Sequence, residues 1–484
     1  MTRILPVLLL GCLLSLPLAA QLPTAAPSSS QGSNNTASQS DPLPPSTPPL
    51  DVFMGSAKVE KPVAGTVKLS IREAMDLGLK HNLGLLLSQQ QTETARAQHW
   101  RSLSALLPKA EVRAAESVQQ VNLAAFGIPF TVNGSTIVGP FSIFDARPTV
   151  TERLLDFNAL NRLRAADEGE KAVRHNIDDA RELVILVVGN EYLLTLADAA
   201  LLESALAQAT TAKAIYDRSV DLKKAGVAAG IDVLRSQVQL RQQQQRVLTA
   251  QNQLAQQRMQ FARVIGLPVS QAFELTDQVP NPPTPPVDLE EALARAYERR
   301  PDYLALASRV KAAELMVRAA QGEALPTFDL NGDIGVIGRS VGSSRETYSV
   351  AGALRIPVFQ GGRIKADVMQ AQSNLRQLRF QMEDMKNRIE MEVRSAALDV
   401  NSSGDQVKVA RDSIGLAGEQ LKQSQDRYAS GVSGSLEVVQ SQEAVATADE
   451  TLIQALYRNN IAKLTLARAL GVAEQQARAF LGGR

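Results

Sequence analysis

Leu69-Ser-Ile-Arg-Glu-Ala-Met-Asp-Leu-Gly-Leu-Lys-His-Asn-Leu83 is matched 218 residues later by Val287-Asp-Leu-Glu-Glu-Ala-Leu-Ala-Arg-Ala-Tyr-Glu-Arg-Arg-Pro301. A second pair of stretches, 205 residues apart, is Ala225-Gly-Val-Ala-Ala-Gly-Ile-Asp-Val-Leu234 and Ser430-Gly-Val-Ser-Gly-Ser-Leu-Glu-Val-Val439. A duplication of this length is typical of two copies of one structural unit related by pseudo-symmetry. The sequence therefore predicts two similar halves, and the function has to use both.

Composition narrows the class of protein. The 484 residues carry 51 Lys and Arg against 50 Asp and Glu, which argues against nucleic acid as a partner, because that would call for a basic surface. Aromatic residues make up only 4% of the chain, a composition that suits long helices better than a compact enzyme core.

The N-terminus has the features of an export signal. Arg3 supplies a positive charge, Ile4 to Leu18 is mostly apolar, and Leu18-Ala19-Ala20 offers small residues for cleavage before Gln21. The apolar run is too short for a membrane span. Cys12, the only cysteine, excludes an intramolecular disulfide. It resembles a lipoprotein attachment site, but we favour an incidental small residue because apolar sequence continues to Leu18.

Composition shifts divide the rest of the chain. Prolines and small polar residues after the signal indicate a segment that cannot bury enough apolar surface to order itself. We predict a signal peptide (1–20), a disordered Pro/Ser-rich lead (21–66), a first repeat (67–279), a Pro-rich linker (280–286), a second repeat (287–474) and a C-terminal tail (475–484).

Each repeat has a long proline-free block, from Thr149 to Leu267 and from Val358 to Arg484. Since an interior proline costs a helix about 3 kcal/mol, its absence indicates long helices. Each block contains one glycine-rich turn, so each is predicted to be a helical hairpin whose longer arm spans roughly 100 Å. The arms are expected at about 158–222, 231–265, 363–427 and 436–470. The apolar run Leu183 to Val188 is interpreted as a packing surface, not a membrane span.

Between these blocks the hydrophobic period changes to two. Apolar residues alternate with polar ones from Phe328 to Val336 and again from Tyr348 to Val358, with a turn at Gly338 to Arg345. The first repeat has the same layout with weaker alternation and a longer loop, from about Asn122 to Phe144. The pattern predicts two strands in each repeat, with one apolar face.

Such strands fit either a half-buried soluble hairpin in each repeat or part of a transmembrane barrel. Four strands cannot close a barrel, and an open edge cannot lie in lipid, so several chains would have to share eight, twelve or sixteen strands. The export signal and the very long helices favour the membrane interpretation.

These landmarks, from about Leu69 to Gly471, resemble the outer membrane efflux protein family, the TolC-like channels. The duplicated opening motif, the strand-to-helix junction Leu354-Arg-Ile-Pro-Val-Phe-Gln-Gly-Gly-Arg363, the tip Tyr428-Ala-Ser-Gly-Val432 and the closing stretch Ala467-Arg-Ala-Leu-Gly471 carry the resemblance.

The resemblance implies a mostly α fold with a membrane β-barrel portion. Three chains would form a twelve-stranded outer membrane barrel on a periplasmic α-helical barrel. It also implies a passive duct of a tripartite efflux or type I secretion system, with a periplasmic adaptor (membrane fusion) protein and an inner membrane pump of RND or ABC type as partners. Neither catalysis nor a cofactor is implied.

The resemblance also assigns residues at the hairpin tips. Glu437 corresponds to a ring acid of the channel aperture, Gln440 stands where a second acid is often found, and Tyr428 matches a gate tyrosine. Ser433 replaces an arginine that tethers the closed state in the family. Asp232, the repeat partner of Glu437, could add a charge near the same level. For both acids the alternative is simply a favourable position in the first turn of a helix.

The tips would also meet the adaptor, through Gly226, Val227, Gly431 and Val432, although the glycines equally suit plain turns. Other chemistry finds little support. His81, His99 and His175 lack metal-ligand spacing. No nucleophile with an adjacent base stands out, which argues against a secreted enzyme. The remaining alternative function is a soluble periplasmic coiled-coil scaffold without a pore.

Overall fold

The computed structural model describes residues 50–57, 60–62, 65–127, 130–131, 134–277 and 288–480. The predicted signal peptide with Cys12, most of the lead and the linker at 280–286 lie outside the described residues. The architecture below is that of the unit from Pro44 to Arg484.

The two repeats consist of the same elements in the same order. The first contains α1 (Ile71–His81), α2 (Leu83–Ser104), β2 (Lys109–Asn122), β3 (Ile137–Leu155), α3 (Phe157–Lys224) and α4 (Gly230–Ile265). The second contains α5 (Leu289–Arg299), α6 (Pro301–Gly322), β5 (Thr327–Gly338), β6 (Arg345–Arg355), α7 (Arg363–Ala429) and α8 (Ser435–Ala469). The predicted duplication, the two helical hairpins and the two pairs of strands are thus confirmed.

Local signals explain where the repeated helices begin. Ser70 caps α1 in a capping box with Glu73, and Asp288, at the equivalent position of the second repeat, caps α5 by accepting hydrogen bonds from Glu290 N and Glu291 N. The opening motif therefore starts a helix in each repeat. Asp156 likewise caps α3 at the point where β3 ends.

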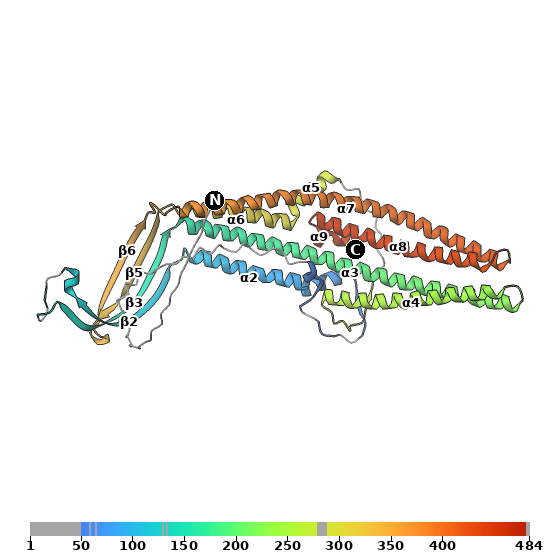
Figure 1. The fold of residues 1–484 in the computed structure, drawn as a ribbon, viewed down its shortest axis with the longest axis horizontal. Helices are drawn as coiled ribbons and strands as arrows, with labels where there is room; N and C mark the ends of the chain where they lie inside the picture. The colour runs from blue at the N-terminus through green and yellow to red at the C-terminus, as the bar shows by residue number, and fades with distance from the viewer. Residues whose placement is uncertain are drawn as a thin grey trace, which may run out of the picture. The chain divides into compact units, whose positions relative to one another are not determined.

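The long helices lie side by side as a wall (Figure 1). Near the sheet, the helices lie across the wall in the order α2, α3, α6, α7. Farther from the sheet, the order is α4, α3, α8, α7. The long helix α3 therefore packs on α6 at one end and on α8 at the other. α3 and α7 run the length of the wall. The shorter helices lie end to end along it, with α2 followed by α4 and α6 followed by α8. The main core cluster lies where these shorter helices meet, and it includes Tyr192, Phe261 and Leu464.

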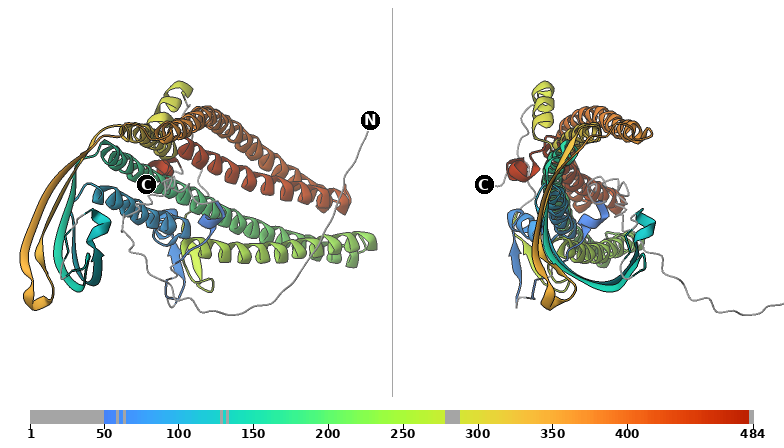
Figure 2. Two further views of the ribbon diagram at one scale, coloured as in Figure 1. Left: turned by 60° about the vertical axis from the view of Figure 1, so that its left-hand side comes forward. Right: turned by 90° about the vertical axis from the view of Figure 1, so that its left-hand side faces the viewer.

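The four long strands form one antiparallel sheet in the order β2-β3-β5-β6, so β3 and β5 join the two repeats. Figure 2 shows that this sheet is curved. The register places Val150 beside Gly332 and Gly332 beside Val350, on a face that is mostly apolar. The opposite face carries Arg147, Asp333 and other polar groups. The predicted one-sided strands are confirmed.

One strand boundary differs from expectation. β3 begins at Ile137, so the loop of the first hairpin is shorter than the predicted Asn122 to Phe144. The alternation is weak there, and the strand is held by backbone pairing with β2, from Asn122 beside Ile137 onward, more than by a local pattern.

The prediction of a disordered lead to residue 66 is wrong for its described end. A 3-10 helix, η1 (Leu50–Met54), places Phe53 in the core with no exposed surface. The phenyl ring occupies the space beside Gly84, where an added Cβ would lie 2.5 Å from it, and Asn82 Nδ2 donates a hydrogen bond of 2.6 Å to Phe53 O. One buried aromatic ring orders a segment whose average composition indicates disorder.

The boundary predicted for the C-terminal tail is also misplaced, because residue 475 lies inside helix α9 (Ala473–Phe480). The Glu182 carboxylate accepts hydrogen bonds from Ala473 N and Glu474 N, at 2.7 and 3.2 Å, and Arg181 pairs with Glu474. These contacts join α9 to α3.

The apolar run of α3 belongs to the core, as predicted. One window of this helix is long and apolar enough to cross a membrane, but 61% of it is buried inside the chain. Val184 and Val188, for example, are fully buried.

Candidate functional site: the hairpin tips

Both hairpin tips are built on the same backbone turn. Gly226 and Gly431 adopt left-handed conformations, with φ of 75° and 73°, directly after the last helical turns of α3 and α7. Val227 N and Val432 N then donate to the carbonyls of Leu222 and Arg427, at 2.9 and 3.0 Å. This turn satisfies the carbonyls at the helix ends and needs a residue without a Cβ at the glycine.

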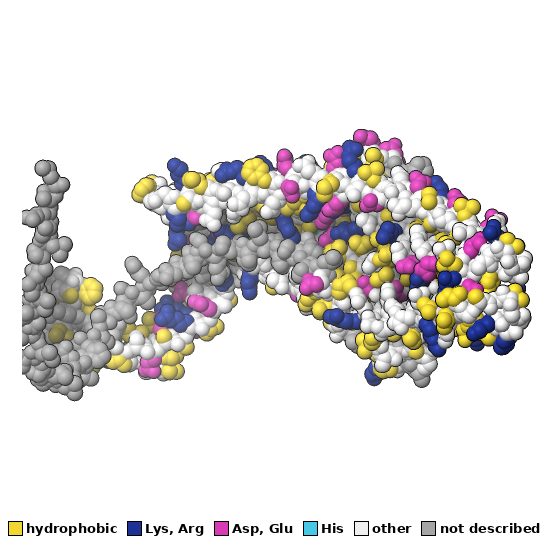
Figure 3. Space-filling view, turned by 45° about the vertical axis from the view of Figure 1, so that its right-hand side comes forward, with side chains coloured by type: hydrophobic (Ala, Val, Ile, Leu, Met, Phe, Trp, Pro, Cys, Tyr) yellow, Lys and Arg dark blue, Asp and Glu magenta, His cyan; other side chains and the backbone are white. Residues whose placement is uncertain are grey.

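The turn leaves one valine of each tip in solvent. Val227 is 69% exposed and Val432 is 71% exposed. Between the tips, a shallow depression of about 350 Å³ lies between α4 and α8, and its apolar lining includes Ile231, Leu234 and Leu436. Figure 3 shows apolar side chains mixed with charges of both signs at this end of the molecule.

Glu437 lies in the first turn of α8 and is partly exposed. Its Oε1 atom is 3.4 Å from Arg427 Nε, at the end of α7 in the same hairpin. Gln440, three residues further along α8, is exposed. The expected aperture acid is therefore accessible, but it has a cation beside it.

Asp232 differs from its repeat partner. Only 17% of its side chain is exposed, and its Oδ1 atom accepts a hydrogen bond of 2.6 Å from the hydroxyl of Ser435, which is fully buried. This contact joins the first turns of α4 and α8. Asp232 thus ties one hairpin to the other instead of presenting a free charge beside Glu437.

Tyr428 is buried, with 7% of its surface exposed, and packs with Ile215 of α3 and Val438 of α8. Its hydroxyl lies 3.2 Å from the hydroxyl of Ser219 on α3. The tyrosine therefore links the two hairpins one turn behind the tips.

The contact partners Ser219, Arg427 and Ser435 were missed by sequence reasoning. Their neighbours along the chain have no unusual pattern, and serine at helical positions is common. The only available signal was the repeat itself. It aligns Arg427 with Leu222, which shows that the turn does not require a charged residue at this position.

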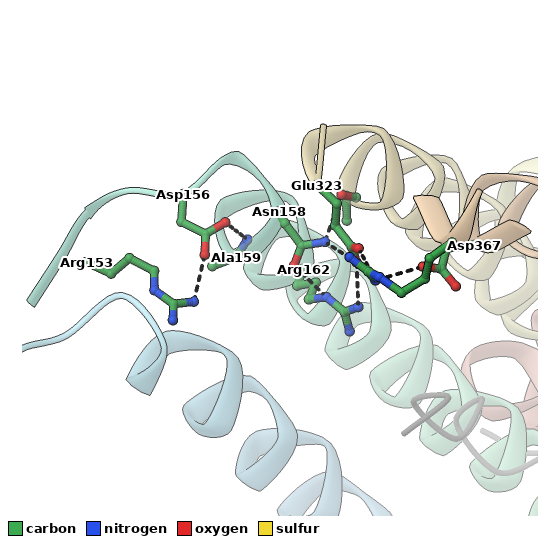
Figure 4. A network of polar contacts seen from close by, with 9 residues as sticks. Arg153, Asp156, Asn158, Ala159, Arg162, Glu323 and Asp367 are labelled. Atoms are coloured by element: carbon green, nitrogen blue, oxygen red, sulfur yellow. Dashed lines mark hydrogen bonds and ion pairs between the residues drawn. The ribbon is translucent and has the colours of Figure 1, made fainter. Parts of the chain in front are cut away.

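A second polar network lies at the opposite end of the hairpins, where the sheet meets the helices (Figure 4). Arg153 Nε lies 3.3 Å from Asp329 Oδ1, across the β3–β5 seam. Asn158 donates to Glu323, and the same carboxylate pairs with Arg363 of α7 at 2.7 Å. These contacts join the two repeats where α3 and α7 begin.

Among the residues that the structure describes, no group of three or more His, Cys, Asp or Glu side chains is arranged to hold a metal ion. The three histidines lie apart from one another, each near its own carboxylate: His81 near Glu60, His99 near Asp167 and His175 near Asp178.

Comparison with known proteins agrees with this architecture. The model of the family described as "Outer membrane efflux protein" matches residues 292–472. The outer membrane protein OprJ of Pseudomonas aeruginosa is 25% identical over 91% of this chain and 94% of its own length. The second repeat thus matches the outer membrane efflux protein family, and nearly the whole chain is similar to an outer membrane protein.

Other outer membrane channels are similar to this chain as well. TolC of Escherichia coli is 24% identical over 54% of this chain and 57% of its own length. The Campylobacter jejuni CmeC outer membrane channel superposes with a TM-score of 0.73 at 18% identity, over 87% of this chain and 92% of that one. The fold is TolC-like, and the outer membrane location predicted from the sequence agrees with these relatives.

Proposed function

We propose that this chain is one third of a passive duct across the outer membrane, through which an efflux or type I secretion system exports its substrates. The observation that supports this proposal most strongly is the four-stranded sheet. It has one apolar face and one charged face, and among the described residues its outer strands β2 and β6 each pair with another strand on one side only. An open edge in lipid would leave backbone groups without hydrogen bonds.

Closure by three chains meets this requirement. Head-to-tail pairing of β2 with β6 of the next copy gives twelve strands, with the apolar faces toward lipid and the charged faces toward the lumen. The helical walls then continue as a tube into the periplasm. On this basis the chain has no catalytic step and needs no cofactor, and a partner supplies the energy of transport.

The hairpin tips are the proposed contact with the periplasmic adaptor, which delivers substrates from an inner membrane pump of RND or ABC type. The two exposed valines and the backbone around Gly226 and Gly431 support this assignment, because a repeated apolar knob on a rigid turn can be bound several times around a ring. Glu437 and Gln440 are proposed to face the aperture. Tyr428 and Asp232, through Ser219 and Ser435, are proposed to hold it narrow.

The proposed organisation of the chain follows its composition and its repeats. Residues 1–20 direct export, the two repeats begin at residues 67 and 287, and residues 280–286 connect them. Cys12 stays assigned to the signal peptide, with lipid attachment as the alternative.

The proposal predicts opposite outcomes for neighbouring residues of β6. Val350, 73% exposed on the apolar face, would lie in lipid, and Ser349 would lie in the lumen. Arginine on the lipid side of a barrel costs about 2–4 kcal/mol near the bilayer midplane. We expect Val350→Arg to reduce the heat-stable trimer in outer membrane extracts and Ser349→Arg to leave it intact.

Planar bilayer recordings with the surviving trimer test the duct itself. A stable conductance is expected from the unmodified chain and from Ser349→Arg. Equal tolerance of both arginines, together with a protein that stays in the soluble periplasmic fraction, would instead favour the coiled-coil scaffold.

A further inference from the structure

Three acidic side chains at the tips lie near cations of the same chain. Glu437 lies beside Arg427, Asp232 Oδ1 is 3.8 Å from Arg235 Nη1, and Asp221 Oδ1 is 3.1 Å from Lys224 Nζ. At these three positions the charge of the acid is compensated by a cation. Among these acids, Glu437 is the one that faces the aperture in the proposed function. Its partner Arg427 is therefore the cation that can change the charge of the aperture.

The Arg427–Glu437 pair is too exposed to serve mainly as a structural tie. The side chains are 57% and 40% exposed, and ion pairs of this kind contribute only about 0–1 kcal/mol to stability. These two charges have a larger effect on the electrostatic potential in the proposed aperture. Three copies around an aperture would place three positive charges within a few ångströms of three negative ones.

The turn itself does not require an arginine. Leu222 occupies the equivalent position in the first hairpin, and its carbonyl accepts from Val227 N as the Arg427 carbonyl accepts from Val432 N. The arginine side chain is thus free of any task in the turn. The backbone at Arg427 is nevertheless held in place, because the adjacent Tyr428 is buried against α3 and α8.

We propose that Arg427 determines the ion preference of the aperture by neutralising Glu437 of the same chain. The inference rests on the proposed function, in which Glu437 faces the passage. A tip compensated in this way attracts small cations weakly and lets anionic, neutral and cationic substrates pass with similar ease. Removing either partner unmasks the other charge.

The test is the potassium-to-chloride permeability ratio of the full-length trimer in planar bilayers under a KCl gradient. In water, one unit charge several ångströms from an ion changes its local concentration about threefold. Because the charge changes the potassium and chloride concentrations in opposite directions, we expect Arg427→Gln to raise the ratio about ninefold and Glu437→Gln to lower it by a similar factor. The double variant should return close to the starting ratio. The effects should shrink in 1 M salt, where the screening length is about 3 Å.

Two control variants separate the pair from general effects. Arg427→Lys keeps the charge and should keep the ratio. Lys422→Gln removes an exposed cation of α7 one to two turns from the tip and should change the ratio little. All variants are first checked for trimer by size-exclusion chromatography.

The failures are distinguishable. If neither Glu437→Gln nor Arg427→Gln changes the ratio while the channels conduct, the aperture role of Glu437 is wrong and the inference fails with it. If Glu437→Gln shifts the ratio but Arg427→Gln does not, or the double variant behaves like Glu437→Gln alone, only the role of Arg427 is overturned. An equal effect of Lys422→Gln would also overturn it.

Discussion

Single residues are most constrained where the two ends of the second repeat touch. Gly471, which closes the second repeat after α8, has a φ of 68°, and an added Cβ would lie 2.8 Å from the backbone nitrogen and Cα of Arg300. Arg300 is itself buried and pairs with Asp302 and Glu392. The last glycine of one motif thus packs directly on the boundary between α5 and α6.

Gly471→Ala should therefore destabilise the chain. The left-handed backbone and the clash with Arg300 together cost roughly 2–4 kcal/mol, because both contacts are with backbone that cannot easily move. We expect a lower melting temperature of the purified protein, measured by circular dichroism in detergent.

Gly418→Ala is the matched control. Gly418 lies within α7, and an added Cβ would meet nothing within 4 Å, so alanine should be neutral or stabilise the helix by about 0.5–1 kcal/mol. Equal melting temperatures for the two variants would contradict the importance of the close approach at Gly471.

At the scale of elements, the α3–α4 hairpin contains buried carboxylates. Glu191 is 3% exposed, and its Oε2 atom accepts a hydrogen bond of 2.8 Å from Gln257 Nε2 on α4. Burial raises the pKa of the Glu191 carboxyl above its ordinary value of 4.5, and the Gln257 hydrogen bond only partly opposes this. Asp198, with its pKa likewise raised by burial, pairs with Gln253 one turn of α4 away.

The sign of the pH effect follows from this direction. The folded chain binds the Glu191 proton more readily than the unfolded chain, so the charged form is penalised on folding at neutral pH. This cost of burying the charged Glu191 carboxylate disappears as the pH falls through the raised pKa of the folded chain toward the ordinary value of 4.5. Glu191→Gln should remove it, and the gain in stability relative to the unmodified chain should be larger at pH 7 than at pH 5.

Thermal unfolding at the two pH values measures this difference. Exposed Glu450 of α8 offers a control, since Glu450→Gln should give the same shift, close to zero, at both pH values. A Glu191→Gln variant that is much less stable than the parent at pH 7 would show that the charge itself is required.

At the scale of the whole molecule, the helical wall of the unit from Pro44 to Arg484 has two exposed apolar edges. α7 packs on α5, α6 and α8, and its other side exposes an apolar row with steps of 11 and 7 residues, which correspond to three and two helical turns. The row consists of Met369, Phe380, Met391, Leu398, Val409 and Leu416. The opposite edge, on α2 and α4, exposes Leu87, Trp100, Val238 and Leu248.

These two edges are the surfaces that would meet in the proposed ring. Phe380 is 73% exposed in the single chain, and its burial against a neighbour would contribute about 1.5–3 kcal/mol per copy. Phe380→Glu should therefore shift the trimer toward monomers in detergent, as measured by light scattering after chromatography. Phe380→Leu, which stays apolar, should remain trimeric, and an unchanged trimer for Phe380→Glu would exclude this edge from the interface.

Much of the architecture could be predicted from local sequence. The duplicated motif carries its own helix caps at Ser70 and Asp288, and the absence of proline predicts helices close to the observed α3 and α7. The left-handed turns at Gly226 and Gly431 need glycine whatever surrounds them. These features depend on residues a few positions apart, so backbone sterics and hydrophobic period are sufficient to predict them.

Only the tertiary structure decided which distant side chains meet. Phe53 orders part of a proline-rich lead because Gly84 leaves room for its ring, and α9 is held by Glu182, about 290 positions away in the chain. The Tyr428 hydroxyl reaches Ser219 of the other hairpin because the two hairpins are packed together at the tips. Such contacts depend on how segments far apart in the chain pack together, and the local periodicity of the sequence contains no record of that geometry.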